Sequence, residues 1–264
     1  MARTSHMDES KVVIQMKDIV KKFGDFTAND HINLTVHKGE VHAILGENGA
    51  GKSTMMNVLC GLYKPTSGQI FINEKEVHFN SPKDAIDIGI GMVHQHFMLI
   101  PSLTVAENVV LGVEPMKNGL FDFKKAVAMT QEVAEKYNFN IDPMAKVCDL
   151  SVGQMQKIEI MKVLIKGAKI IIMDEPTAVL TPQETDELFD QLILLRDSGH
   201  SIIFISHKLE EVKRICTRVT VLRHGYCLGS HDLADMSESD ISRLMVGRDV
   251  VLKINKKDPK IGKK

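Results

Sequence analysis

The sequence of 264 residues lacks an excess of charge, paired cysteines and any long hydrophobic run. Its formal net charge is −1, and no segment rich in lysine and arginine alternates with aromatic residues, which argues against nucleic acid as the main partner. The four cysteines form no C-x-x-C pair, which favours reduced thiols in a cytosolic protein over a disulfide framework. No apolar run approaches the ~18 residues of a membrane span and no signal peptide is visible, so we expect membrane association only through a partner.

What the sequence does contain is a candidate phosphate-binding loop. Residues 46–54 fit the pattern G-x-x-x-x-G-K-[ST] at every specified position, between a predicted strand at 41–45 and the start of a predicted helix at 54–59. In such a turn the glycines aim backbone N–H groups at one point, and the helix N-terminus adds positive potential. We expect Lys52 to reach the β- and γ-phosphates of a nucleotide and the Ser53 hydroxyl to bind Mg²⁺. A chance match is the alternative, which the flanking elements disfavour. The loop comprises Gly46, Glu47, Asn48, Gly49, Ala50, Gly51, Lys52, Ser53 and Thr54.

Two carboxylates follow a second buried strand. Residues 170–173 form an unbroken apolar run, which is typical of a central parallel strand, and Asp174 and Glu175 come directly after it. Ligands of such sheets bind at the carboxyl ends of the strands. We expect Asp174 to hold Mg²⁺, directly or through water, and Glu175 to polarise the water that attacks the γ-phosphate. A solvated strand end is the alternative, which the phosphate loop upstream makes the weaker interpretation.

Alternating apolar and polar residues predict a small antiparallel sheet beside the phosphate site. The alternation runs from 12 to 36, and short apolar runs at 70–72 and 77–79 continue it. Phe23 and Gly24 are expected at its first turn. Residues 1–10 show no periodicity, and the first seven resemble a vector-derived sequence joined to a natural start at Met7.

Helical patterns separate the two strand-rich parts of the chain. Ser81 and Pro82 predict the start of a short helix, because serine is a favourable N-cap and proline is tolerated in the first turn. Apolar residues at helical spacing over 124–137 indicate that residues 97–150 form a helical insert.

A helix start precedes the second strand. Ser151 and Gln154 form an S-x-x-Q capping box before the amphipathic segment 155–166, so their purpose can be purely local. With Gly153, which leaves the backbone open, this helix N-terminus also offers a second anion site. The segment 150–154, with the sequence LSVGQ, resembles the L-S-G-G-Q motif of ATP-binding-cassette (ABC) ATPases.

The chain resembles an ABC-transporter nucleotide-binding domain over residues 12–247. The resemblance implies an α/β fold: a P-loop NTPase (RecA-like) core with an antiparallel β subdomain and an inserted helical subdomain at about 97–153. It also implies ATP and Mg²⁺ as cofactors, with Ser151, Gly153 and Gln154 contacting the nucleotide of a partner cassette.

Three further residues match motifs of that family. Phe23 matches the aromatic residue that stacks on adenine. Gln95 matches the glutamine that senses the γ-phosphate and Mg²⁺ and joins the core to the helical insert. His207, which follows the apolar strand at 202–205, matches the histidine that contacts the γ-phosphate; a lone histidine at a strand end is more often structural, but its position here favours the functional interpretation.

The resemblance can be narrowed to importers of simple sugars and nucleosides. Residues 92–101 and 176–184 are similar to those of the bacterial nucleoside-type branch, whose ATPases carry two cassettes in one chain. Residues 248–264 resemble the start of the linker to the second cassette. The implied partners are membrane permease subunits, a second cassette in the same full-length chain or a homodimer, and indirectly a solute-binding lipoprotein. The implied location is the cytoplasmic face of the cell membrane, held there through the permease.

The sequence departs from the family pattern at two places. Val152 replaces the usual third-position glycine of the L-S-G-G-Q motif. Residues 178–181 read AVLT where the broad family has S-A-L-D, so the aspartate is absent, and Thr181 with Glu184 instead makes a helix capping box. The second change puts in doubt how strongly two nucleotide sites are coupled.

Two rival classes share part of the pattern. Residues 255–258 spell N-K-x-D, as in a GTPase, but they lie in a lysine-rich tail and no D-x-x-G accompanies the phosphate loop. A soluble ABC ATPase that acts on ribosomes or DNA shares most of the motifs. Two features argue against that class. The chain carries no net positive charge. Residues 97–101 are apolar, and in transporters these residues lie near the groove for the permease.

Overall fold

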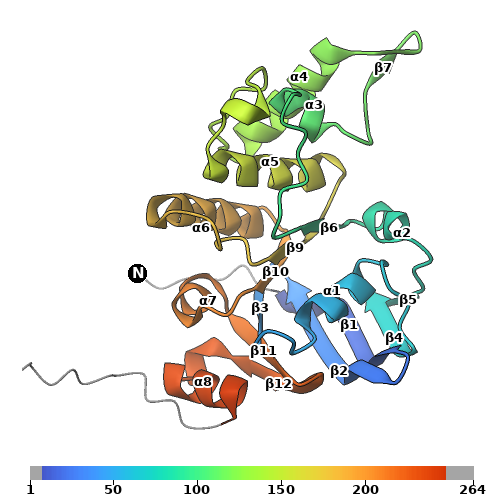
Figure 1. The fold of residues 1–264 in the computed structure, drawn as a ribbon, viewed down its shortest axis with the longest axis vertical. Coiled ribbons are helices and arrows are strands. Elements are labelled where there is room, and N and C mark those ends of the chain that lie inside the picture. The colour runs from blue at the N-terminus through green and yellow to red at the C-terminus, as the bar shows by residue number, and fades with distance from the viewer. Residues whose placement is uncertain (1–7, 248–264) are drawn as a thin grey trace, which may run out of the picture.

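A single ten-stranded sheet runs through the part of the chain that the computed structural model describes, residues 8–247. Its strand order is β5-β4-β1-β2-β12-β11-β3-β10-β9-β6 (Figure 1). The parallel strands of the core are β3 (Val41–Leu45), β6 (Ile90–Val93), β9 (Ile170–Asp174), β10 (Ser201–Ile205) and β11 (Arg218–Arg223). The phosphate loop and the two carboxylates therefore leave the sheet at the same edge.

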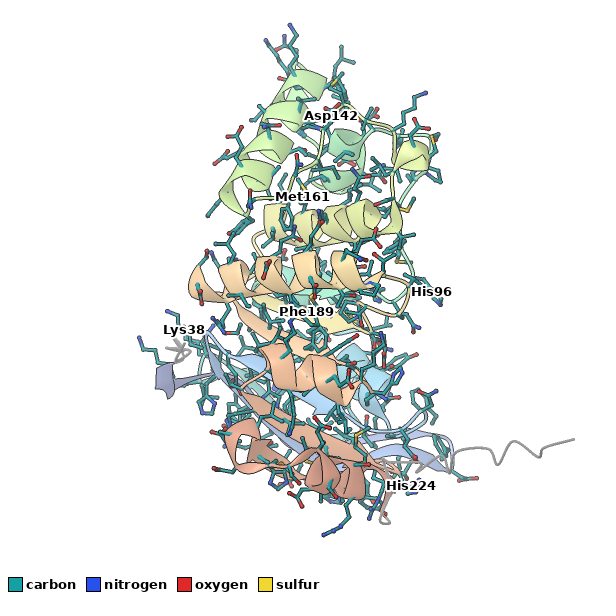
Figure 2. The ribbon with its side chains drawn as sticks, turned by 90° about the vertical axis from the view of Figure 1, so that its left-hand side faces the viewer. Lys38, His96, Asp142, Met161, Phe189 and His224 are labelled. Atoms are coloured by element: carbon teal, nitrogen blue, oxygen red, sulfur yellow. The ribbon has the colours of Figure 1, made fainter. Side chains whose placement is uncertain are left out.

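Buried side chains on both faces explain why the core strands are apolar without interruption. Ile171 and Met173 of β9 pack with one hydrophobic cluster, and Ile170 and Ile172 pack with the other. The helices that cover the core are α1 (Lys52–Leu59), α6 (Pro182–Asp197), α7 (Leu209–Ile215) and α8 (Glu238–Val246). Phe189 of α6 lies between this helix and the sheet (Figure 2), with its ring centroid 6.0 Å from that of Phe204 on β10. The α/β fold predicted from the sequence is confirmed.

The predicted antiparallel strands form one end of the same sheet. They are β1 (Asp8–Phe23), β2 (Phe26–Lys38), β4 (Ser67–Ile72) and β5 (Lys75–Val77). They join the parallel core through β12 (Tyr226–Asp232), which pairs antiparallel with β11 and touches β2 at Tyr226 and Asp30. The strand expected at 77–79 ends at Val77, where its pairing with Ile70 of β4 ends, and Phe79 is buried beyond it.

Helices form the end of the molecule that lies beyond α6 (Figure 1). These elements are α3 (Val105–Val109), α4 (Phe123–Lys136), the 3-10 helix η1 (Val147–Asp149) and α5 (Val152–Ile165). The helix predicted over 124–137 is thus present with a shift of one residue. A hairpin that the sequence analysis did not anticipate, β7 (Met116–Lys117) and β8 (Leu120–Phe121), turns at Asn118 and Gly119, both with positive φ.

Two shorter helices complete the fold. Helix α2 (Pro82–Asp87) begins after its N-cap Ser81, as the sequence predicts, and a capping box joins Ser81 to Asp84. The 3-10 helix η2 (Leu233–Asp235) precedes α8. No helix within residues 8–247 has the length and apolar character needed to cross a bilayer.

Strand β1 already includes residues 8–10, which the sequence analysis placed in the irregular start. The proposed vector-derived residues 1–7, the linker at 248–264 and the N-K-x-D sequence within it lie outside the described residues.

Candidate functional site

The phosphate loop joins β3 to α1 and requires glycine at its last turn. Gly51 is the N-cap of α1 with φ 98°. A Cβ atom there would lie 2.5 Å from Asn29 Nδ2 and 2.6 Å from the Ala28 carbonyl oxygen, so a side chain would displace strand β2. The left-handed backbone and the close approach of β2 together explain why glycine precedes Lys52 in the motif.

Lys52 is folded over its own loop. Its ammonium group donates to the Gly46 carbonyl at 2.7 Å and to the Glu47 carbonyl at 3.1 Å. Burial lowers the pKa of Lys52, and the negative charges of Glu175 and Asp174 counteract this shift. A phosphate group that entered the loop would offer the ammonium a charged acceptor in place of two neutral carbonyls.

Asp174 and Ser53 lie together at the carboxyl edge of the sheet. Burial raises the pKa of Asp174, the neighbouring charge of Glu175 adds to this shift, and Lys52, His94 and a hydrogen bond with Ser53 oppose it. A partly buried carboxylate beside a hydroxyl is a pair of oxygen ligands that suits Mg²⁺, which is held by few protein groups together with phosphate oxygens. Residues 8–247 contain no cluster of three or more histidine, cysteine, aspartate and glutamate side chains placed to hold a metal.

Glu175 and His207 form a direct pair. The Nδ1 atom of His207 lies 2.9 Å from Oε1 of Glu175, and the side chain of Glu175 is 12% exposed against 56% for that of His207. Glu175 has φ 48°, an uncommon backbone conformation for a residue with a side chain, and its N–H donates to Ile205 of the adjacent strand at 3.0 Å. The strand pairing of β9 and β10 therefore brings together two residues that the sequence analysis predicted independently.

The sequence analysis did not anticipate the polar residues that join the turn after Glu175 to the segment after His207. The Thr177 hydroxyl donates to Glu211 at 2.6 Å, and the Lys208 ammonium donates to the Thr177 carbonyl at 3.2 Å. Lys208 also forms an ion pair with Glu211 at 2.9 Å. These bonds tie the turn after Glu175 to the start of α7, which follows His207.

Gln95 and Phe23 are both exposed to solvent. Gln95 is exposed directly after β6, and its neighbour His94, which the sequence analysis passed over, lies close enough to Asp174 to lower the pKa of that carboxyl. Phe23 ends β1 and is 43% exposed. Its ring packs edge-on against Tyr63 with centroids 5.3 Å apart, and Lys21 lies 4.9 Å from its centroid. The ring is therefore outside the hydrophobic core and accessible.

Asn29 of β2 is hydrogen-bonded to the phosphate loop. Its amide donates to the Gly51 carbonyl at 3.1 Å, and its Oδ1 atom is buried with no hydrogen-bond partner among the described residues. Beside it, the Gly225 N–H donates to the Ala50 carbonyl at 3.1 Å, and the Gly225 carbonyl accepts from Asp30 at 2.8 Å. No local pattern marks Asn29, because its partner is fixed by tertiary packing.

The predicted second anion site lies at the start of α5, away from the phosphate loop (Figure 1). The Ser151 hydroxyl accepts from the Gln154 N–H at 3.2 Å, and the Gln154 side chain accepts from the Ser151 N–H at 3.0 Å, which confirms the predicted capping box. Ser151, Gly153 and Gln154 line a hollow of about 880 Å³ between α4, α5 and α6, and no residue of the phosphate loop borders it. Within one chain, these residues do not complete the nucleotide site.

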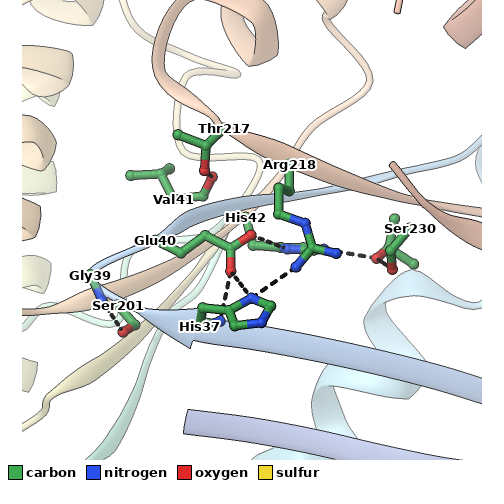
Figure 3. A network of polar contacts seen from close by, with 10 residues as sticks. His37, Gly39, Glu40, Val41, His42, Ser201, Thr217, Arg218 and Ser230 are labelled. Carbon is green, nitrogen blue, oxygen red and sulfur yellow. Dashed lines mark hydrogen bonds and ion pairs between the residues drawn. The ribbon is translucent and has the colours of Figure 1, made fainter. Parts of the chain in front are cut away.

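The opposite edge of the sheet carries a separate polar network (Figure 3). Glu40, which is fully buried, accepts from the His37 N–H at 2.6 Å and pairs with His42 at 2.7 Å, and His42 reaches Thr220 at 2.7 Å. Burial alone would raise the pKa of Glu40, but the bonds from His42 and His37 outweigh it and hold the pKa below its usual value. The network links β2, β3 and β11. It lies near the amino ends of the parallel strands, whereas the phosphate loop and the two carboxylates lie at their carboxyl ends.

Comparison with known proteins finds relatives of this chain in both sequence and overall fold. Residues 29–178 match the family model described as ABC transporter. The chain is 48% identical over 241 residues to the nucleoside import ATP-binding protein NupA of Lactococcus lactis, covering 91% of this chain and 48% of that protein. It is 52% identical over 245 residues to the guanosine import ATP-binding protein NupO of Bacillus subtilis, covering 93% and 48%. The chain thus spans about half the length of the curated relatives it matches.

Solved structures with a similar fold are also cassettes of ABC transporters. The ADP conformation of an ATP-binding cassette of an ABC transporter superposes with a TM-score of 0.76 at 27% identity, covering 88% of this chain and 94% of that one. A bacterial ABC transporter cassette described as dimeric gives a TM-score of 0.70 at 28% identity, covering 83% and 98%.

Proposed function

This chain belongs to the ABC transporter family as an ATP-binding domain, and we propose that it binds MgATP and hydrolyses it to energise the import of a nucleoside or simple sugar through a membrane permease. The observation that carries the proposal is the meeting of Ser53, Asp174, Glu175 and His207 at one edge of the sheet. The relatives supply the direction of transport, because they are named for import.

The roles of the site residues follow from their positions. Ser53 and Asp174 would hold Mg²⁺, which when bound neutralises phosphate charge. Lys52 would exchange its two loop carbonyls for the β- and γ-phosphates. Glu175 would accept a proton from the attacking water, and His207, bonded to Glu175, would hold that carboxylate in place and contact the γ-phosphate together with Gln95. Phe23 would stack on the adenine.

An apolar groove supports the permease as a partner. A cavity of about 230 Å³ lies between the α2–β6 segment and α5, and its lining includes the half-exposed apolar side chains Leu62, Ile86 and Met98. The segment after Gln95 forms one wall, so a helix of the permease that filled the groove would contact the site's own loop. This placement supports a peripheral position on the cytoplasmic face of the membrane, with a solute-binding lipoprotein acting on the permease from the other side.

A second cassette would complete the nucleotide site. Ser151, Gly153 and Gln154 lie away from the phosphate loop of their own chain, so they are available to the ATP of another. The partner would be a second cassette in the same full-length chain or a second copy of this one. On this reading residues 11–247 are the ATPase domain, with the helical subdomain at about 97–153, and 248–264 lead toward the second cassette.

The test is direct. The purified chain should hydrolyse ATP, and excess EDTA should abolish hydrolysis; an equal rate with EDTA would remove Mg²⁺ from the proposal. A pull-down should recover the chain with candidate permeases and not with ribosomes or DNA. Recovery with ribosomes or DNA alone would favour a soluble ABC ATPase, the alternative that the named relatives disfavour.

A further inference from the structure

Glu184 bridges the N-termini of two helices. In the first turn of α6, its Oε2 atom accepts from the Thr181 N–H at 3.0 Å and from the Thr181 hydroxyl at 3.1 Å, which is the predicted capping box. Its Oε1 atom accepts from the Gly153 N–H at 3.0 Å and from the Ser151 hydroxyl at 3.2 Å on α5. One carboxylate therefore serves its own helix with one oxygen and a distant helix with the other.

The contact with α5 depends on glycine at position 153. A Cβ atom there would lie 2.7 Å from Glu184 Oε1 and 2.8 Å from its carboxyl carbon. Hydrogen bonds from the Thr181 and Gly153 N–H groups outweigh burial and lower the pKa of Glu184, so its carboxylate is ionised at neutral pH. A negative charge thus occupies the donors of the α5 N-terminus.

Those donors are the ones that the proposed function assigns to a partner's nucleotide. The hollow of about 880 Å³ that Ser151, Gly153 and Glu184 line gives a phosphate group access to them. A phosphate and the Glu184 carboxylate cannot both accept from the same N–H and hydroxyl groups, and two negative groups at such a distance repel each other.

We propose that Glu184 is an internal anion that fills the second anion site of the unpaired cassette and that the γ-phosphate of a partner's ATP displaces it when two cassettes pair. This inference rests on the proposed function. Glu184 then opposes ATP-driven pairing, because each ATP that bridges two cassettes must first break the bonds from Gly153 and Ser151. In the paired state Glu184 keeps its capping role through Thr181.

A purely structural role predicts a different outcome. If Glu184 only fastened α5 to α6, removing its charge would loosen the α5 N-terminus and would leave pairing unchanged or weaken it. The two readings therefore differ in the sign of the effect on pairing.

The test compares three forms of the chain that all carry Glu175→Gln to slow hydrolysis. The first has no further change, the second adds Glu184→Gln, and the third adds Glu187→Gln. Glutamine at 184 keeps the capping box, since glutamine serves there as well as glutamate, while removing the charge. Glu187 lies on the same helix and lines the same hollow but pairs with Lys157, so its variant controls for a general loss of negative charge.

Sedimentation equilibrium with MgATP gives the dimer dissociation constant of each form. We expect Glu184→Gln to lower it about tenfold, in the range of one charge-assisted hydrogen bond, and Glu187→Gln to leave it near the reference. Equal association of the Glu184→Gln and reference forms, including no association of either, would overturn the inference. ATP binding of the reference form, measured separately, distinguishes this result from a failure of the proposed function.

Discussion

His207 Nδ1 and Glu175 Oε1 lie 2.9 Å apart, although 32 positions separate the two residues in the chain. The parallel pairing of β9 with β10, which sets Asp174 opposite Ile205, brings their strand ends together. The bond restrains the carboxylate that would activate water, and Lys208 and Glu211 anchor the segment after the histidine. The chemistry of the site therefore depends on sheet register as much as on the identity of its residues.

The first prediction separates binding from hydrolysis. Lys52→Ala should abolish ATP binding, because the ammonium is the cation of the phosphate loop. Glu175→Gln should keep ATP binding and lower turnover by about 10²–10⁴-fold, the contribution typical of a general base. Titration calorimetry and a phosphate-release assay measure the two effects. Hydrolysis by Glu175→Gln at the wild-type rate would show that Glu175 is not the base.

The second prediction concerns the partner of Glu175. His207→Ala should lower turnover by about 10²-fold while ATP binding changes little, because the carboxylate loses the bond that orients it. The control is His78→Ala, which removes a histidine whose side chain is 83% exposed and pairs only loosely with Glu76. A His207→Ala variant that binds and hydrolyses ATP like the His78→Ala control would restrict His207 to a structural role.

The third prediction tests the adenine contact. Phe23→Ala should weaken ATP binding by about 1–3 kcal/mol, the range of base stacking on an aromatic ring. Binding of GTP should weaken as well, because a ring face discriminates poorly between bases. Phe26 begins the next strand and is 66% exposed, so Phe26→Ala is a matched control in the same hairpin. Unchanged ATP affinity in a folded Phe23→Ala variant would contradict the assignment.

The fourth prediction addresses the support of the phosphate loop. Asn29→Ala leaves the Gly51 carbonyl without its amide donor, so the free energy of unfolding should fall by about 1–3 kcal/mol and ATP affinity should fall with it. Asn33→Ala changes an exposed asparagine of the same strand and should leave ATP affinity unchanged. Urea unfolding and ATP titration measure both quantities. Loss of stability without loss of ATP affinity would mean that Asn29 acts on the strand alone.

The fifth prediction concerns pairing. Thr181 stands at the position of the aspartate in the S-A-L-D segment of the broad family, so we expect weak pairing: this chain should be a monomer without ATP and form little dimer even as Glu175→Gln with MgATP. Adding the second cassette should raise hydrolysis per ATP site well above the rate of the single chain. Sedimentation and ATPase assays on both forms check this. A tight ATP-dependent homodimer that hydrolyses as fast as the two-cassette protein would refute it.

The sequence predicted local elements well because their causes are local. The loop from Gly46 to Thr54 has its strand and helix on either side, and the helix starts predicted at Ser81, Ser151 and Thr181 are each defined within four residues. The hairpin at Met116–Phe121 was missed although Asn118 and Gly119 are a recognised turn pair, because its strands have only two residues each.

Residues whose partners are remote could not be predicted. Asn29 reaches Gly51 across 22 positions, Thr177 reaches Glu211 across 34, and Glu184 reaches Gly153 across 31. Each is an ordinary polar residue in the sequence, and only the packing of two elements assigns its partner. The capping pattern predicted the bonds of Glu184 to Thr181. No local pattern predicted that the other carboxylate oxygen of Glu184 accepts from Gly153.

The loop after Gln95 is bonded to α5 at Met98. Glu159 accepts from the Met98 N–H at 2.6 Å, and Lys162 donates to the Met98 carbonyl at 2.7 Å. Helix α5 also begins with Ser151 and borders the apolar groove. Helix α5 therefore lines the apolar groove near its C-terminal end and carries the predicted second anion site at its N-terminal end. Under the proposed function, the permease and the nucleotide of a neighbouring cassette would contact opposite ends of this one helix.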